Sequence, residues 1–362
     1  MLDEPERLVE ADTWGLLRAA ASAGAQVRST AAIAEEAGLH RLAGERPRAL
    51  VLITRPGAAA AAAPLLVALL GPSCPVPVVT ARSVPVWVGA LDVVLAHTTD
   101  PGDHELAEGV DRAVRRGAHL LVTAPPDGPV AAAASGRSVL LSPRLDVPPG
   151  LVLPRALAAG LLLLDTLGLL RTDAEGLAGE LDREAERAHP AHESFVNPAK
   201  SLALRMAEHT PLLWGTDRVA TAVAGHGAAS LAAHAGVIAH AAGIGEAMSL
   251  SVLRREAAGG AAESDAFHDP YLDASGGNWP PPVRPLLLGV APGPDTAIAT
   301  EALPDADVVG ADEELEVAPG DPTAPACAAG VLALRLDLAA LYLGLARGVL
   351  GGSGRVGSAA LG

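Results

Sequence analysis

The stretch Arg48-Ala-Leu-Val-Leu-Ile-Thr-Arg-Pro-Gly-Ala58, which continues as an apolar run to Leu70, predicts a strand that turns directly into a helix. Its first part is rich in Leu, Val and Ile and stops at a Pro-Gly pair, which is typical of the end of a strand. The run that follows is rich in Ala and Leu, which favour helices. A strand followed at once by a helix is the opening unit of a doubly wound α/β sheet.

The same alternation continues through the first half of the chain, where helical periodicity over residues 5–40 precedes the first strand. Short apolar runs predict further strands at residues 76–80, 92–96, 119–123 and 138–141, and an apolar helix at 151–170. Strands that alternate with helices at this pace favour a parallel sheet with helices on both faces.

The second half repeats this rhythm. Strands are predicted at residues 210–215, 284–290 and 306–309, and helices at 219–242 and 326–349. Between the halves, residues 172–193 are acidic and show no comparable apolar face, which predicts a solvated helix or connector.

These patterns predict an α/β protein with two doubly wound domains, each a parallel sheet flanked by helices. We expect N-terminal helices and a first domain at 1–172, an acidic connector helix at 173–195, a second domain at 196–350 and a flexible tail at 351–362. A chain of 362 residues, half of them hydrophobic, is long enough for two such domains.

Composition limits the classes of function. The net charge of −16 argues against a nucleic-acid partner, since such proteins carry basic surfaces. Two cysteines cannot form a disulfide framework, which favours a reducing cytoplasm, and the acidic N-terminus is unlike a signal peptide. The longest apolar runs contain charged residues, such as Arg335 and Asp337, so we expect buried helices and no membrane partner.

Residues 30–39 resemble the turn of a helix-turn-helix, which raises the alternative of a DNA-binding regulator. The first 50 residues carry more acidic than basic side chains, and this argues against that alternative.

Two turns that follow strands are candidate anion sites, because backbone N–H groups and the dipole of a following helix favour negative charge there. The first turn contains Arg55 and Gly57, and the second contains Thr98 and Thr99. The alternative is that both are ordinary strand–helix connections, with Asp100 as the N-cap of the second helix. Arg155, at the start of an apolar helix, is either a cover over the helix end or an inward-facing anion clamp.

Histidines gather in the second half of the chain, at His226, His234 and His240, with Glu246 beyond them. Their spacings do not fit a metal site, so no metal is expected. Glu246 and His240 are candidates for proton transfer, and the alternative is a packed helix that happens to contain histidines. His268, in a stretch with two aromatic residues, is either part of an active-site loop or an anchor for a long connection, and we favour the anchor.

Four segments in order carry a resemblance to a known family: residues 76–90, 153–160, 197–215 and 334–349. The most specific part is Asn197-Pro-Ala-Lys200 followed by Thr210-Pro-Leu-Leu-Trp-Gly215. Together they resemble the two-domain sugar isomerase (SIS) superfamily, specifically the bifunctional phosphoglucose/phosphomannose isomerase family and its divergent branch in high-GC actinobacteria.

The resemblance implies two SIS-type domains and a homodimer. It also implies aldose–ketose isomerisation of a sugar phosphate through an enediol, without a metal or another cofactor. Thr98 and Thr99 would then hold the phosphate and Arg155 would stabilise enediolate charge, while Glu246 and His240 remain the candidates for moving the proton.

The chain departs from the family pattern at its functional loops. Arg55-Pro-Gly-Ala58 replaces a glycine-rich loop with a serine, and the phosphate loop Ser-x-Ser-Gly-x-Thr becomes His97-Thr-Thr-Asp-Pro-Gly102. The family's catalytic Glu and His motifs are absent from residues 225–247, and Lys200 is the only lysine. Two functions therefore stay open: an active isomerase, or a protein that binds a sugar phosphate as a sensor or scaffold without catalysis.

Overall fold

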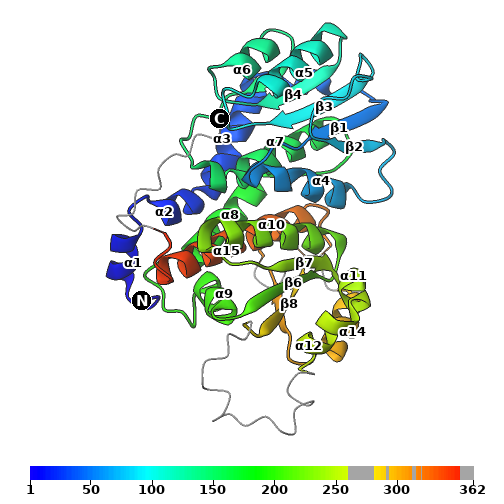
Figure 1. The fold of residues 1–362 in the computed structure, drawn as a ribbon. Coiled ribbons are helices and arrows are strands. Elements are labelled where there is room, and N and C mark those ends of the chain that lie inside the picture. The colour runs from blue at the N-terminus through cyan, green and yellow to red at the C-terminus, as the bar shows by residue number, and fades with distance from the viewer. Residues whose placement is uncertain (260–280, 291–292, 312–314, 319, 351–362) are drawn as a thin grey trace, which may run out of the picture.

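The computed structural model describes residues 1–259, 281–290, 293–311, 315–318 and 320–350, and it contains two parallel sheets separated by a layer of helices (Figure 1). His268 and the tail 351–362 lie outside the described residues. The predicted class, α/β with two parallel sheets flanked by helices, is confirmed.

The first sheet has five parallel strands in the order β2-β1-β3-β4-β5. The strands are β1 (Ala49–Ile53), β2 (Val78–Ala81), β3 (Asp92–His97), β4 (His119–Thr123) and β5 (Val139–Leu141). Side chains alternate between the two faces of a strand. Val51 therefore packs against the outer helices, while Leu50 and Leu52 face the inner ones.

The helices of this half divide between the two faces of the sheet. Outer helices α5 (His104–Arg115) and α6 (Pro129–Ala134) cover one face. The inner helices are α3 (Ala23–Glu36), α4 (Ala62–Leu70) and α7 (Leu153–Thr166), and the short helices are α1 (Pro5–Ala11), α2 (Leu16–Ala21), η1 (Leu39–Leu42), η2 (Ala58–Ala61) and η3 (Pro149–Leu151).

The second sheet has four parallel strands in the order β7-β6-β8-β9. These are β6 (Thr210–Gly215), β7 (His240–Gly243), β8 (Val283–Gly289) and β9 (Asp307–Gly310). This is the order β2-β1-β3-β4 again, so the two halves repeat one topology in which β6 corresponds to β1. The helices of this half are α8 (Ala174–Arg187), α9 (Pro198–Met206), α10 (Arg218–Ala235), α11 (Ile244–Ser249), α12 (Ser251–Ala257), α14 (Pro294–Ala302) and α15 (Ala324–Ala346).

One apolar core reaches from the inner face of the first sheet to the inner face of the second. At its centre lies α15, the red helix of Figure 1, which packs against α8, α9 and α10. Within the described ranges, α15 is the one helix long and apolar enough to cross a membrane, yet the apolar window that qualifies it is wholly buried. It is therefore a core helix.

The acidic segment is not the solvated helix that its composition predicted. Helix α8 packs against α3 and α15, and both Glu180 and Glu184 are fully buried. Arg335 of α15 donates to Glu184 from Nε (2.7 Å) and Nη2 (2.9 Å). The pattern was misleading because Arg335, one of the two arginines that pair with Glu184, lies far away in the sequence, while the other, Arg187, belongs to α8 itself.

One further prediction is wrong, and one alternative finds no support. The helix predicted over 219–242 ends at Ala235, because Gly236 takes a left-handed conformation (φ 61°), and His240 begins strand β7. No helix-turn-helix forms at residues 30–39, because α3 runs unbroken to Glu36 and the next helical turn, η1, is only four residues long before the chain leads into β1.

The buried pair between α8 and α15 gives a stability test. Arg335→Met leaves the carboxylate of Glu184 inside the core with Arg187 as its remaining ion-pair partner, so urea unfolding should show a loss of roughly 3–5 kcal/mol. The double variant Arg335→Met/Glu184→Leu removes both charges and should recover most of that loss. A double variant as unstable as the single one contradicts this account.

Candidate functional site

A cavity of about 370 Å³ lies at the carboxyl edge of the first sheet. Its lining includes Thr98 and Thr99 after β3, Asp146 in the segment after β5, and Arg155 in the first turn of α7. In open parallel sheets, ligands bind at the carboxyl ends of the strands. The structure thus brings together three residues that the sequence nominated: Thr98, Thr99 and Arg155.

Arg155 is buried, with 8% of its surface exposed, yet it forms no hydrogen bond or ion pair with any residue in the described part of the chain. Burial lowers the pKa of its guanidinium, and the nearby carboxylate of Asp146 acts in the opposite direction. A buried cation without a bonded anion is costly, because no partner replaces the water it has lost. An anion bound in the cavity would remove that cost.

The two threonines differ in what they can offer to a ligand. The hydroxyl of buried Thr98 accepts a hydrogen bond from the backbone N–H of Asp100 (3.1 Å). The hydroxyl of half-buried Thr99 has no partner among the residues described. Thr99 is therefore free to donate to an oxygen of a ligand.

His97, the last residue of β3, also lines this cavity, and the sequence patterns did not nominate it. It is buried, and neither ring nitrogen has a hydrogen-bond partner in the described part of the structure. Burial, together with the charge of Arg155, lowers its pKa to about 3. The imidazole is consequently neutral at physiological pH.

A carboxylate of the protein itself, that of Asp103, occupies the N-terminus of α5. Asp103, and not the predicted Asp100, caps the helix, and its carboxylate accepts from the backbone N–H of Leu106 (3.0 Å). Arg55 binds the same carboxylate through Nε (2.7 Å) and Nη2 (2.8 Å) and also pairs with Glu105. The predicted phosphate contact of Arg55 is thus replaced here by carboxylates of the chain itself.

The other nominated residues lie elsewhere. Gly57 borders a separate groove between the two halves of the molecule. His240 lies on β7, where its Nδ1 accepts a hydrogen bond from Trp214 Nε1 (3.1 Å), and Glu246 is exposed on α11. Neither His240 nor Glu246 lines the cavity that contains Arg155.

A histidine pairs with a carboxylate in a way that sequence reasoning missed. His226 Nε2 lies 2.9 Å from Asp337 Oδ1, and both side chains are buried. The available signal was the spacing of His226, Ser230 and His234, which puts them on one face of a helix at every fourth residue. A search for metal-ligand spacing overlooks such a row.

Comparisons with known proteins identify the fold. No protein-family model matches the sequence, and no curated protein matches it. Among solved structures, a proposed phosphosugar isomerase from Clostridium difficile is 10% identical, with a TM-score of 0.60 over 92% of this chain and 93% of that one. A glucose-6-phosphate isomerase-like protein from Thermus thermophilus is 20% identical, with a TM-score of 0.52 over 97% and 95%.

A tagatose-6-phosphate ketose/aldose isomerase from Escherichia coli is also similar, with 9% identity and a TM-score of 0.55 over 92% of this chain and 91% of that one. At these identities the likeness defines the fold alone. The chain therefore has the two-domain SIS-type fold of phosphosugar isomerases, and the resemblance seen in the sequence is confirmed at this level.

The buried imidazole of His97 predicts how stability depends on pH. The pKa of His97 is lowered in the folded protein, so below about pH 6.5 the unfolded chain binds a proton that the folded chain does not bind. The free energy of unfolding therefore decreases as the solution is acidified below this pH. Between about pH 7 and pH 5 this one group should cost about 2 kcal/mol of unfolding free energy.

Urea unfolding of wild type and His97→Leu at both pH values isolates this contribution. On acidification from pH 7 to pH 5 the variant should lose about 2 kcal/mol less unfolding free energy than wild type, since leucine cannot take up a proton. Equal losses in the two proteins would show that His97 titrates normally in the folded state.

Proposed function

We propose that this protein binds a sugar phosphate, of the glucose 6-phosphate or mannose 6-phosphate kind, in the cavity that contains Arg155, and that it acts as a sensor or scaffold. The observation that carries the proposal is the buried guanidinium of Arg155, which has no hydrogen-bonded or ion-paired partner among the described residues and lines a cavity where ligands of this fold class are expected. The names of the similar structures support a phosphorylated sugar as the ligand.

In this proposal Arg155 pairs with phosphate oxygens, a geometry for which the guanidinium fork is suited. Thr99 donates its free hydroxyl to the ligand, and the neutral ring of His97 offers a donor and an acceptor to sugar hydroxyls. Each of these contacts would satisfy a polar group that has no partner in the described part of the chain.

The lining of the cavity argues against efficient isomerisation. Proton transfer at carbon needs a base whose pKa lies near the working pH. His97, with a pKa of about 3, is far too weak a base, and the nominated Glu246 and His240 lie outside the cavity. The start of α5 is occupied by Asp103, which further separates this site from an ordinary phosphate loop.

An active isomerase is the second candidate, and one observation favours it: the carboxylate of Asp146 lines the same cavity as Arg155. Asp146 would serve as the base that moves a proton between adjacent carbons, and Arg155 would stabilise the enediolate. Asp146→Asn separates the two candidates, because it would abolish turnover in the isomerase and leave binding in the sensor.

We further propose that the protein is cytoplasmic and forms a homodimer. Both cysteines, Cys74 and Cys327, are free thiols, which supports a reducing compartment. The dimer rests on the family resemblance, and light scattering that gives twice the chain mass of 36.3 kDa would support it.

Calorimetric titration with glucose 6-phosphate, mannose 6-phosphate and fructose 6-phosphate tests the ligand proposal. Arg155→Gln should weaken binding by about tenfold to a hundredfold, because a charge-assisted hydrogen bond pair is lost. The matched control is Arg46→Gln, an exposed arginine outside the cavity, which should bind as wild type does. Wild-type protein that binds none of these sugars, or equal affinities of the two variants, contradicts the proposal.

The carboxylate of Asp103 at the N-terminus of α5 allows a gain-of-function test. Asp103→Ser keeps an N-cap hydroxyl but removes the carboxylate, which leaves Arg55 with Glu105 as its remaining ion-pair partner, so inorganic phosphate should bind about tenfold more tightly than to wild type. Titration with phosphate measures this, and unchanged affinity would mean that Asp103 does not compete with a ligand.

A further inference from the structure

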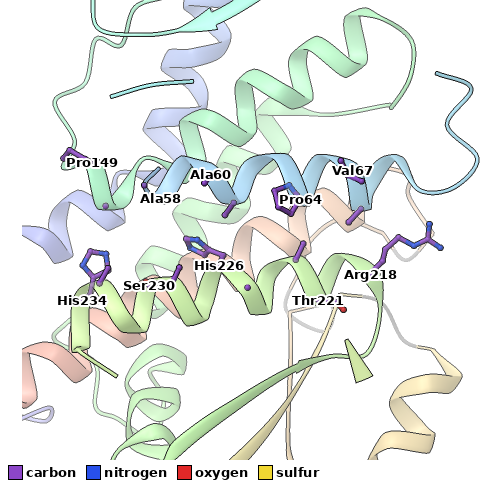
Figure 2. A pocket seen from close by; sticks show the side chains of 18 of the residues that line it. Ala58, Ala60, Pro64, Val67, Pro149, Arg218, Thr221, His226, Ser230 and His234 are labelled. Carbon is purple, nitrogen blue, oxygen red and sulfur yellow. The ribbon is translucent and has the colours of Figure 1, made fainter. Parts of the chain in front are cut away.

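A second and larger cavity lies between the two halves of the molecule. The segment of η2 and α4 runs alongside α10, and the two enclose a groove with a volume of about 1190 Å³ (Figure 2). Small residues create this space, since the α4 side presents mainly Ala and Gly, while Ala222, Gly225, Ala229 and Ala233 line the α10 side. Pro64 and Val67 are the bulkier apolar groups of the α4 wall.

Most of the polar groups in this groove belong to one row on α10. His226, Ser230 and His234 follow one another at every fourth residue and are 3%, 5% and 9% exposed. Ser230 donates to Asp337 Oδ1 (2.7 Å), the atom that also lies 2.9 Å from His226 Nε2. Asp337 Oδ1 therefore lies close to both side chains, although the contact with His226 Nε2 does not have hydrogen-bond geometry.

The other ring nitrogens have no partner in the protein. His226 Nδ1 and both nitrogens of His234 form no hydrogen bond with any described residue, and although both side chains are at least nine-tenths buried, these atoms are not fully enclosed by the protein. Figure 2 shows the two rings on the side of α10 that faces the groove. Polar atoms that face an otherwise apolar groove can bond to a polar atom of a ligand there, and these nitrogens offer that contact.

The charge of the groove suits an anion. Among the described residues no carboxylate lines it, although the chain carries a net charge of −16, and its ionisable lining groups are Arg218, His226 and His234. Two carboxylates near the groove already have partners within the protein. Asp217 caps α10, and Asp337 accepts a hydrogen bond from Ser230 and lies beside His226. An acidic group placed beside the histidines would therefore meet donors and no lining carboxylate.

The length of the groove suits an extended chain. Its lining row on α10, from Thr221 to His234, is about 20 Å long at 1.5 Å per residue, and small apolar residues lie along it. A single alkyl or isoprenyl chain has this form.

We infer that the groove between α4 and α10 binds a single-chain amphiphile, with its apolar chain against Pro64 and Val67 and its acidic head group, a carboxylate or phosphate, at His226 and His234. This site is separate from the cavity that contains Arg155, although both cavities include Pro149 in their linings. It gives the protein a second ligand of a different chemical class.

Calorimetric titration below the micelle concentration, with dodecyl phosphate, dodecanoate and dodecanol as probes, tests the inference. The two acidic probes should bind, and dodecanol should bind at least tenfold more weakly because it lacks the charge. Octyl phosphate should be much weaker than dodecyl phosphate, since each buried methylene contributes about fourfold in affinity. Equal binding of all three dodecyl probes, or no binding of the acidic ones, overturns the inference.

Variants locate the site. Ala229→Trp fills the groove and should abolish binding, while Ala232→Trp, on an exposed part of α10 that does not line the groove, should bind as wild type does. His234→Phe keeps the ring volume and should reduce the preference for acidic probes over dodecanol, since His226 alone then contacts the head group. Arg155→Gln should keep full affinity for dodecyl phosphate, which distinguishes this site from the sugar phosphate site.

Two results with the variants would overturn the inference. One is binding of dodecyl phosphate that Ala229→Trp leaves unchanged. The other is a change in molar mass of Ala229→Trp by light scattering, which would show that a second copy of the chain covers the groove.

Discussion

The packing of both sheets against one shared helical layer is the constraint on which the rest of the structure depends. A parallel sheet must be covered on both faces, and each sheet here uses its own outer helices and a common inner layer centred on α15. That layer places the buried ion pair between Arg335 and Glu184 in the middle of the molecule. It also sets α4 beside α10 and creates the groove between the halves.

The same architecture positions the proposed sugar phosphate site. Strand order fixes which loops meet at the carboxyl edge of the first sheet, and α7 returns from the inner layer to bring Arg155 to that edge. The site differs from an ordinary phosphate loop in electrostatics more than in backbone. Asp103 caps the start of α5 and pairs with Arg55, so in the proposed site Arg155 is the arginine left to bind an anion.

Much of the fold could be predicted from the sequence because strands such as β1 and β4 are continuous apolar runs, and their burial on both faces requires that pattern. Two features of the fold could not be predicted from the sequence. Strand β7 contains Ala and Gly and becomes a strand by pairing with β6. Helix α8 buries Glu184, and one of the partners of this residue, Arg335, lies 151 residues away. Local pattern carries no information about such partners.

The candidate site was anticipated only in part. Thr98 and Thr99 were nominated because they follow a strand, Arg155 because it begins a helix, and the family resemblance points to all three, which line one cavity in the structure. The pairing of Arg55 with Asp103 spans 48 residues and was invisible, as was the pairing of His226 with Asp337. Spacing within one helix would have revealed the row of His226, Ser230 and His234, but not the carboxylate beneath it.

The most direct test of the central claim is proton NMR of fructose 6-phosphate with the protein in deuterated water. We expect saturation transfer from protein to sugar, which reports binding, with no deuterium at C2 and no aldose after prolonged incubation. Deuterium at C2 that disappears in Arg155→Gln would contradict the claim, because it would show that the cavity moves a proton and that the protein is an isomerase.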